Sequence, residues 1–197
     1  MKTWEIILAP SISMRKVVHG ISWLDRHMGS LLHKGVAQVE KNWQAKNVVH
    51  KIALQAPEED EYLLLHIWST LKIWLYVAML DEAGQYTYFD KRMPEEEKQR
   101  IMSFYKRCLK RYLFEKGQQD KHYLAKNPHF TPMIDTLYQH FPDAKIIYLV
   151  RNPLDVIPSN ISLKEQEWQL LGDPTEAYAS RDYILEMAKH WYNYPLE

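Results

Sequence analysis

The sequence predicts an α/β protein that is rich in helices and built around a parallel sheet. Glycine is scarce, with six among 197 residues, which favours helices over many short strands joined by tight turns. One apolar run, Lys145 to Val150 (KIIYLV), is typical of a strand buried on both faces of a sheet. Strand and helix signals alternate from about residue 121 to 163, so a βαβ unit of a parallel sheet is expected there. We expect a single domain over residues 1–197.

The elements of the predicted βαβ unit, two strands with a helix between them, can each be placed on the sequence. Residues 121–126 (KHYLAK) are expected to form a short first strand. Thr131 is placed to cap a helix whose first position is Pro132 and which runs to about Phe141. After the turn at FPDA and the strand over 145–150, Pro153 is expected to begin another helix.

The strongest helix signal lies between Pro94 and Gly117. Three glutamates occupy its first turn, the basic residues gather late, and glycine follows its end. One face carries apolar side chains at helical spacing, namely Ile101, Phe104, Tyr105, Cys108 and Tyr112. Cys108 is the one cysteine, and this pattern makes it a small core residue and not a nucleophile.

The apolar segment 61–80 is long enough to be a transmembrane helix, so this possibility has to be considered. Its predicted start has Pro57 near the first turn, followed by four acidic residues (58–61). His66 and Lys72 lie inside it, and a central lysine costs about 2.5–3.5 kcal/mol on membrane-insertion scales. We therefore expect a buried helix and no membrane contact.

Weaker signals cover the other segments. Residues 5–9 are expected to form a short strand or a helix start, residues 22–45 a helix weakened by two glycines, and residues 84–90 a turn and an extended piece. A final helix is expected to be capped by Asp173, with Pro174 at its first position.

Composition narrows the classes of partner. Lys plus Arg equals Asp plus Glu, at 25 each, so no global positive field favours a nucleic-acid partner. A single cysteine and the lack of a secretion signal favour a reducing, cytoplasmic location. No residue spacing indicates a metal site, and the oligomeric state is left open.

Two cations stand where predicted strands give way to helix starts, Lys126 and Arg151. In open parallel sheets, ligands bind outside the carboxyl ends of the strands. Helix N-termini attract anions through free N–H groups and the helix dipole. Ser159 follows about two turns after Pro153, roughly 9 Å along a helix at 1.5 Å per residue. These residues suit phosphate or sulfate. The alternative is a solvated Arg151, or one paired with Asp155.

Pro158 complicates this geometry. It lacks the backbone N–H of a helix interior, so the sequence predicts a kink, or an end of the helix just before Ser159.

The stretch KNPHFTPMIDTLYQHFPDAKIIYLVRNPLDVIPSNISL closely resembles the sulfotransferases that use 3′-phosphoadenosine-5′-phosphosulfate (PAPS). That family has Lys-[Ser/Asn/Thr]-Pro after a strand, Phe-Pro-Asp-Ala-[Lys/Arg] before an apolar strand, then Arg-[Asn/Asp]-Pro, with a serine eight residues past the arginine. All are present over about 123–163. TWEIILAPSIS and APEEDEYLLLHIW look like segments of the bacterial-type branch. The resemblance implies a three-layer fold like that of P-loop NTPases.

The resemblance also implies roles for individual residues. Arg151 and Ser159 correspond to the pair that grips the 3′-phosphate of PAPS. Lys126 corresponds to a lysine near the sulfuryl group, where an ammonium offsets charge on the leaving oxygen. The implied reaction is in-line transfer of the sulfuryl group to a hydroxyl or amine of a small-molecule acceptor, with adenosine 3′,5′-bisphosphate (PAP) as product and no metal ion.

One family feature is missing from this sequence. The phosphosulfate-binding loop, a turn rich in Gly and Ser/Thr after the first strand, is not found among the six glycines. We expect a fold incomplete at the N-terminus, a fragment that is inactive alone. The alternative is a family member without the loop that binds nucleotide and does not turn over.

The general base is open between two residues. Some relatives use a carboxylate that would correspond to Glu5. Others use a histidine close to the lysine strand, which points to His129, although some of them place it one position later, at Phe130 here. A helix-entry histidine facing solvent is the alternative for His129, and a surface strand carboxylate is the alternative for Glu5.

Other interpretations compete with the sulfotransferase. A nucleotide kinase relative is disfavoured because no Gly-Lys-Ser/Thr is present and Arg151, not an aspartate, ends the 145–150 strand. A helical interaction module remains possible from the sequence. His66 with Trp68 and Trp74 is expected to be core or the lining of an acceptor pocket. The acidic start at 58–61 is expected to be a solvated helix turn.

Overall fold

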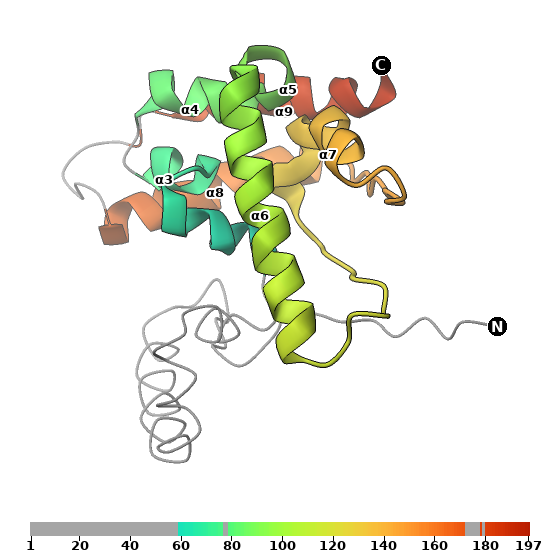
Figure 1. The fold of residues 1–197 in the computed structure, drawn as a ribbon. Helices are drawn as coiled ribbons and strands as arrows, with labels where there is room; N and C mark the ends of the chain where they lie inside the picture. The colour runs from blue at the N-terminus through green and yellow to red at the C-terminus, as the bar shows by residue number, and fades with distance from the viewer. Residues whose placement is uncertain (1–58, 77–78, 172–177, 179) are drawn as a thin grey trace. The chain divides into compact units, whose positions relative to one another are not determined.

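The structure is a computed structural model, which describes residues 59–76, 79–171, 178 and 180–197 (Figure 1). The chain divides into two compact units, Met1–Leu63 with Phe104–Lys126, and Leu64–Ser103 with Asn127–Glu197. We call them unit 1 and unit 2 and describe each by itself. Of unit 1, the structure describes residues 59–63 and 104–126. The predictions for residues 5–9 and 22–45, and for Asp173 and Pro174, lie outside the described residues.

The described residues form α-helices (α) and 3-10 helices (η). In chain order they are η2 Asp60–Ile67, α3 Leu71–Tyr76, α4 Leu80–Thr87, α5 Phe89–Arg92, α6 Glu95–Glu115, η3 Pro128–Met133, α7 Ile134–His140, α8 Pro153–Leu171, α9 Arg181–Asn193 and η4 Tyr194–Leu196.

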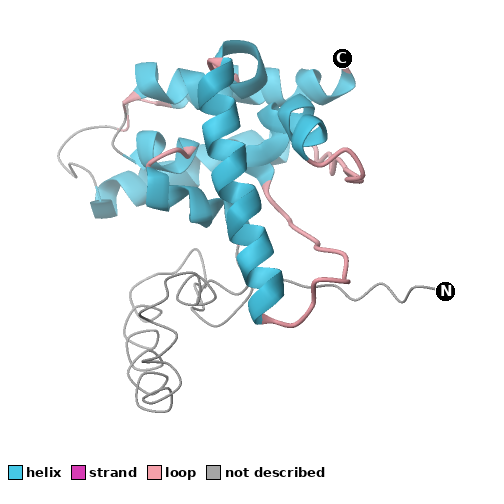
Figure 2. Ribbon diagram, in the orientation of Figure 1, coloured by secondary structure: helices cyan, strands magenta, loops and turns pink. Residues whose placement is uncertain are grey.

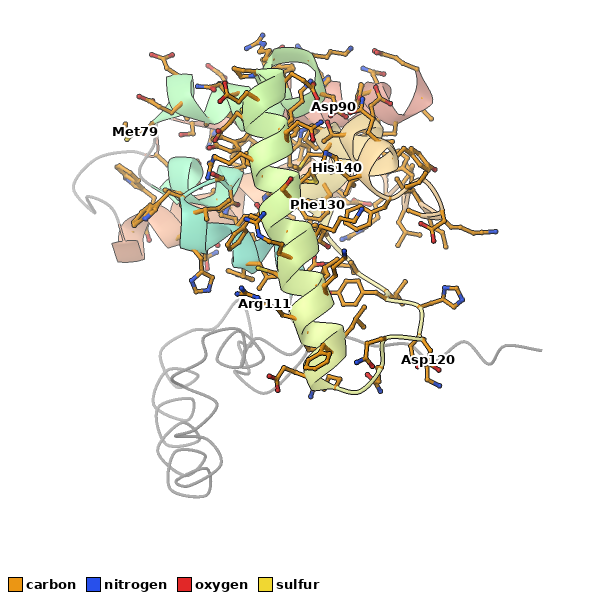
Figure 3. The ribbon with its side chains drawn as sticks, in the orientation of Figure 1. Met79, Asp90, Arg111, Asp120, Phe130 and His140 are labelled. Carbon is orange, nitrogen blue, oxygen red and sulfur yellow. The ribbon has the colours of Figure 1, made fainter. Side chains whose placement is uncertain are left out.

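Helix α6 confirms the strongest sequence signal. It follows Pro94, carries glutamates in its first turn, and ends before Gly117, whose φ of 62° is in the left-handed region that terminates helices. Its expected apolar face is buried at Ile101, Tyr105, Cys108 and Tyr112. Burial raises the pKa of the Cys108 thiol, so the cysteine is a core residue, as predicted. Arg111 of the same helix is exposed (Figure 3).

The single helix expected over 61–80 is wrong. The 3-10 helix η2 ends at Ile67, and Trp68 has a φ of 54°, a conformation that an α-helix cannot contain. Ser69 Oγ donates to the Ile67 carbonyl at 2.9 Å, and Thr70 Oγ1 accepts the Lys72 N–H at 3.2 Å, which starts α3. None of the described helices is long and apolar enough to cross a membrane.

The turn and extended piece expected over residues 84–90 are also wrong. Helix α4 runs through Gly84 to Thr87, and α5 begins at Phe89. Ala83, Thr87 and Phe89 are all buried. Packing of these side chains outweighs the weak helix propensity of Gly84, and local sequence alone does not report that packing.

Unit 2 has a core of packed helices. Helix α3 contacts α4 and α8, and α8 contacts α9. Leu71, Ala83, Ile184 and Met187 form the buried centre, with Ile161 packed against it. Because these residues come from α3, α4, α8 and α9, the core is helix against helix.

The two strands of the predicted βαβ unit are not found, so the expected parallel sheet is not seen in the described residues (Figure 2). Residues 121–126 are irregular apart from one bridge position at Tyr123. Residues 145–150 form neither helix nor strand, and Ile147 and Leu149 are 81% and 80% exposed. Within the part of the chain that the structure describes, their backbone makes no backbone hydrogen bond. A strand requires a neighbouring strand, and none is described beside this segment.

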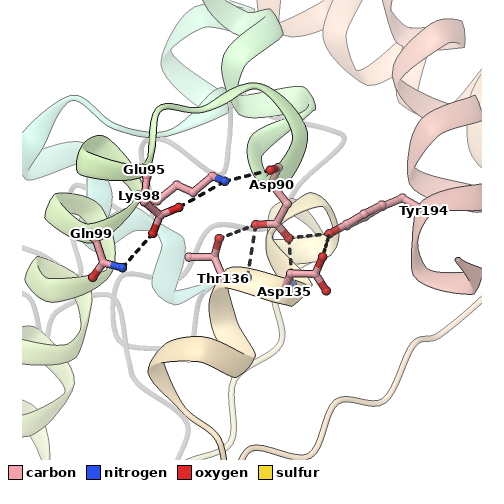
Figure 4. A network of polar contacts seen from close by, with 7 residues as sticks. All are labelled: Asp90, Glu95, Lys98, Gln99, Asp135, Thr136 and Tyr194. Atoms are coloured by element: carbon pink, nitrogen blue, oxygen red, sulfur yellow. Dashed lines mark hydrogen bonds and ion pairs between the residues drawn. The ribbon is translucent and has the colours of Figure 1, made fainter.

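A polar network joins four helices in unit 2, namely α5, α6, α7 and η4 (Figure 4). Asp90 of α5 accepts hydrogen bonds from the N–H of Asp135 at 2.9 Å and of Thr136 at 3.3 Å, both in the first turn of α7. The Tyr194 hydroxyl lies 2.7 Å from Asp90 Oδ2 and 2.9 Å from Asp135 Oδ2. Lys98 donates to the Asp90 carbonyl at 2.9 Å. The network therefore caps α7 and fastens η4.

Candidate functional site

Arg151 precedes a helix that begins at Pro153, as the sequence predicted, and the start of this helix is capped. Asn152 Oδ1 accepts the N–H of Leu154 at 3.0 Å, and its carbonyl accepts the N–H of Asp155 at 3.1 Å. Pro153 is the first residue of α8, where its missing N–H is not needed. Sequence reasoning missed the capping role of Asn152, although Asn before Pro is a signal of a helix start.

Lys126 precedes a second start of the same kind. Asn127 Oδ1 accepts the N–H of His129 at 3.3 Å, and Pro128 is the first residue of η3. The predicted cap at Thr131 is therefore wrong, and the helix begins earlier. Thr131 Oγ1 instead donates to the Pro128 carbonyl at 2.7 Å. The KNP and RNP triplets thus share one local design, in which asparagine caps, proline begins the helix and a cation stands before them.

The position of Ser159 is inside α8, which continues through Pro158 to Leu171. Pro158 therefore does not end the helix before Ser159, because one lost backbone hydrogen bond is outweighed by the rest of a 19-residue helix. Ser159 lies on the helix face of Asn152 and Asp155, seven and four residues earlier. It is exposed, so its hydroxyl can reach a ligand.

The Arg151 guanidinium is exposed while its backbone is fixed. Tyr192 of α9 donates its hydroxyl to the Arg151 carbonyl at 2.9 Å, and the Tyr148 hydroxyl donates to the Trp191 carbonyl at 2.8 Å. Partial burial raises the pKa of Tyr148. Within the described residues, Arg151 and Asp155 are not ion-paired, so the salt-bridge alternative for Arg151 is not seen. The backbone of Arg151 is thus held by Tyr192, and its side chain is exposed to solvent.

Lys126 belongs to unit 1, where two consecutive acids contact its segment. Its Nζ lies 2.5 Å from Glu59 Oε1. Tyr123, three residues earlier, donates its hydroxyl to Asp60 Oδ2 at 3.1 Å. Tyr105 of α6 donates to the same Asp60 oxygen. Burial and the nearby carboxylate raise the pKa values of Tyr105 and Tyr123. The acidic start of η2 is thus not a solvated turn, because Asp60 and Glu61 are buried.

The two candidates for the general base have different outcomes. Glu5 lies outside the described residues. The ring of His129 packs edge-on against Trp191, with ring centroids 5.6 Å apart, so His129 contacts α9 and is half-buried. The solvent-facing alternative for His129 is therefore wrong. Of the other acceptor candidates, Trp68 and His66 are exposed.

The arrangement offers exposed cations for an anion. Arg151, Ser159 and the first turn of α8 belong to unit 2, and Lys126 belongs to unit 1. A guanidinium and a hydroxyl are donors that phosphate and sulfate esters bind in proteins. The N–H groups of Leu154, Asp155 and Val156 already donate to Asn152, so the first turn of α8 adds the positive end of its dipole.

Comparison with known proteins agrees with this chemistry. Over 126 residues the chain is 30% identical to omega-hydroxy-beta-dihydromenaquinone-9 sulfotransferase Stf3 of Mycobacterium bovis, and equally to that of Mycobacterium tuberculosis. The match covers 61% of this chain and 31% of each relative, so the chain spans about a third of the length of these proteins. No solved structure matches. The sequence model of the sulfotransferase family matches residues 14–196. The chain therefore belongs to the sulfotransferase family.

Proposed function

We propose that the protein transfers the sulfuryl group of PAPS to a hydroxyl of a small-molecule acceptor. The observation that carries the proposal is the family match over residues 14–196, which spans both units and includes the exposed Arg151 before the capped start of α8. We propose that both units belong to one sulfotransferase domain.

Arg151 and Ser159 are the proposed ligands of the 3′-phosphate. A guanidinium binds two phosphate oxygens at once, which an ammonium cannot do. The Ser159 hydroxyl supplies another donor, and the first turn of α8 adds the positive end of the helix dipole. The Tyr192 hydroxyl holds the Arg151 carbonyl, which lowers the entropy lost when the side chain binds.

Lys126 is the proposed stabiliser of the leaving group. The acceptor oxygen forms a bond to sulfur while the bond from sulfur to the bridging oxygen breaks, and that oxygen keeps the electron pair. The ammonium offsets the charge that develops there. The acceptor proton passes to a base, for which Glu5 and His129 remain the proposed residues. This chemistry rests on positioning and electrostatics, and the proposed step uses no metal ion.

The acceptor is proposed to be an alcohol. The Stf3 relatives are named for an omega-hydroxy compound, and a hydroxyl suits in-line attack on sulfur. An amine acceptor is the second choice. The 197-residue chain is expected to be inactive alone, so the test uses a form of the protein extended upstream. Incubating that form with PAPS and a panel of alcohols and amines, with sulfated products detected by mass spectrometry, distinguishes the two. Tight binding of nucleotide with no transfer to any acceptor would favour a non-catalytic nucleotide-binding protein.

Calorimetric titration with PAP tests the donor assignment. We expect binding by the 197-residue chain, and a loss of about tenfold or more in affinity for Arg151→Ala, since a hydrogen bond to a charged group contributes about 1.5–3 kcal/mol. Arg111→Ala, another exposed arginine, is the matched control and should bind normally. Equal affinity for AMP and PAP would contradict the 3′-phosphate assignment.

A further inference from the structure

The second half of α6, which belongs to unit 1, carries cations along its exposed face. Arg107, Lys110, Arg111 and Phe114 follow one another at spacings of three, one and three residues, which places them on one side of the helix. All four side chains are exposed (Arg111 is labelled in Figure 3), and Phe114 is 69% exposed. The buried side chains of the helix lie on its opposite side. We call these four residues the α6 stripe.

The positive charge of the α6 stripe is not balanced by nearby acids. Residues 104–116 hold five basic side chains and one carboxylate, Glu115. Within the part of the chain that the structure describes, no ion pair joins the three cations of the stripe to a carboxylate. The first half of the helix differs, because Arg100 is paired there with Glu97 at 2.7 Å. The helix dipole favours cations only within the last turn, so it does not account for the start of the stripe two turns earlier.

Phe114 adds an apolar side chain to this charged surface. Among the described residues, its ring makes no aromatic contact, and a merely solvated charged face gains nothing from an exposed phenylalanine. A membrane surface with anionic lipids complements both features, since headgroup phosphates attract cations and the acyl boundary takes up an aromatic ring. A nucleic acid fits less well, because basic and acidic residues are equal in number over the whole chain.

We infer that the α6 stripe docks the protein on a membrane surface that contains anionic lipids. The three cations lie against headgroup phosphates, and the ring of Phe114 enters the boundary between headgroups and acyl chains. The contact is peripheral, because none of the described helices can cross a membrane. The expectation of no membrane contact was drawn from residues 61–80 and does not extend to this stripe. None of the four residues belongs to the proposed donor site, so the inference is independent of sulfuryl transfer.

Co-sedimentation of the full chain with lipid vesicles tests the inference. We expect binding to vesicles of equal parts phosphatidylserine and phosphatidylcholine, weakened by added salt, and none to phosphatidylcholine alone. Arg107→Gln, Lys110→Gln and Arg111→Gln should each lower the partition coefficient about fivefold, which corresponds to about 1 kcal/mol per cation. Phe114→Ala should lower it with the salt dependence unchanged, because the ring carries no charge. Lys189→Gln, which removes the same charge from α9, is the matched control and should bind normally.

Four outcomes would overturn the inference. These are no binding to the anionic vesicles, equal binding to vesicles without phosphatidylserine, undiminished binding by a variant that combines the three glutamine substitutions, and an equal loss for Lys189→Gln. Binding of a single-stranded RNA oligonucleotide in place of vesicles would assign the stripe to a nucleic acid instead. The substituted side chains are exposed, so circular dichroism and the urea midpoint should show each variant to be folded. Titration with PAP in the absence of vesicles tests the proposed function separately.

Discussion

Helix α6 and the segment 145–150 are both rich in apolar side chains, but the helix buries its apolar residues and the segment exposes them to solvent. Ile101 of α6 is fully buried, whereas Ile147 is 81% exposed. The helix makes its backbone hydrogen bonds within itself, so its apolar face can be buried by any suitable neighbour. The segment needs the backbone of another strand. Apolar content predicts that a segment tends to be buried. Whether a β segment is in fact buried also depends on a partner strand that takes up its backbone hydrogen bonds.

The largest expected effect on the free energy of unfolding is at Ile101, in the buried face of α6. Ile101→Ala should lower the free energy of unfolding by about 2–5 kcal/mol, because it removes methyl groups from a packed site and leaves a cavity. Urea unfolding followed by circular dichroism measures it. Arg111→Ala, on the exposed face of the same helix, should change the free energy by less than about 0.5 kcal/mol. A small loss for Ile101→Ala would mean that α6 is not packed as described.

Alkaline pH should lower the free energy of unfolding through the ionisation of Tyr105 in α6. Burial, with Asp60 beside it, raises the pKa of Tyr105 well above its ordinary value of 10.0. The folded pKa exceeds the unfolded one, so the stabilisation is complete below pH 10 and is lost as pH rises through the folded pKa. The loss is about 1.4 kcal/mol per pH unit for one such group.

Tyr105→Phe tests the assignment of this alkaline loss, because it removes the titrating hydroxyl. The midpoint of alkaline unfolding, followed by circular dichroism with tyrosinate absorbance in parallel, should move to higher pH. Tyr138→Phe, on an exposed ring, should leave it in place. An unchanged midpoint for Tyr105→Phe would assign the alkaline loss to other groups.

The end of α6 offers a smaller effect. Gly117 has a φ of 62°, and a Cβ there would meet nothing within 4 Å. Gly117→Ala should therefore cost only the backbone strain of a left-handed alanine, about 1 kcal/mol. Gly117→Asn should cost less, since asparagine tolerates this conformation. Equal free energies of unfolding for the alanine variant and the wild type would show that the helix does not end through this conformation.

The smallest expected effect on the free energy of unfolding is at Ile147, in the exposed segment 145–150. Ile147→Lys should change the free energy of unfolding by less than about 0.5 kcal/mol, because the side chain is already in water. The same substitution in a strand buried on both faces would place an unpaired charge in the core and cost several kcal/mol. A loss of that size would restore the parallel sheet predicted from the sequence.

Parts of the candidate site could be predicted because their signals are local. Arg151 before Pro153 indicated a cation at a helix start, and the capped N-terminus of α8 confirms it. The partner of Lys126 could not be predicted, since Glu59 is 67 residues away in the chain. The acidic run at the start of η2 was the one signal in the sequence, and its spacing suggested only a helix turn.

The sequence by itself determined the family, the bounds of α6 and the start of α8. These depend on motifs and on the caps of single helices, which act over a few residues. The tertiary structure decided that residues 60–76 break at Trp68, that residues 84–90 are helical, and that 145–150 has no strand partner among the described residues. It also decided that Asp60 and Glu59 hold the lysine segment. In each case distant residues supply the packing or hydrogen bonds, and their free energy outweighs local propensity.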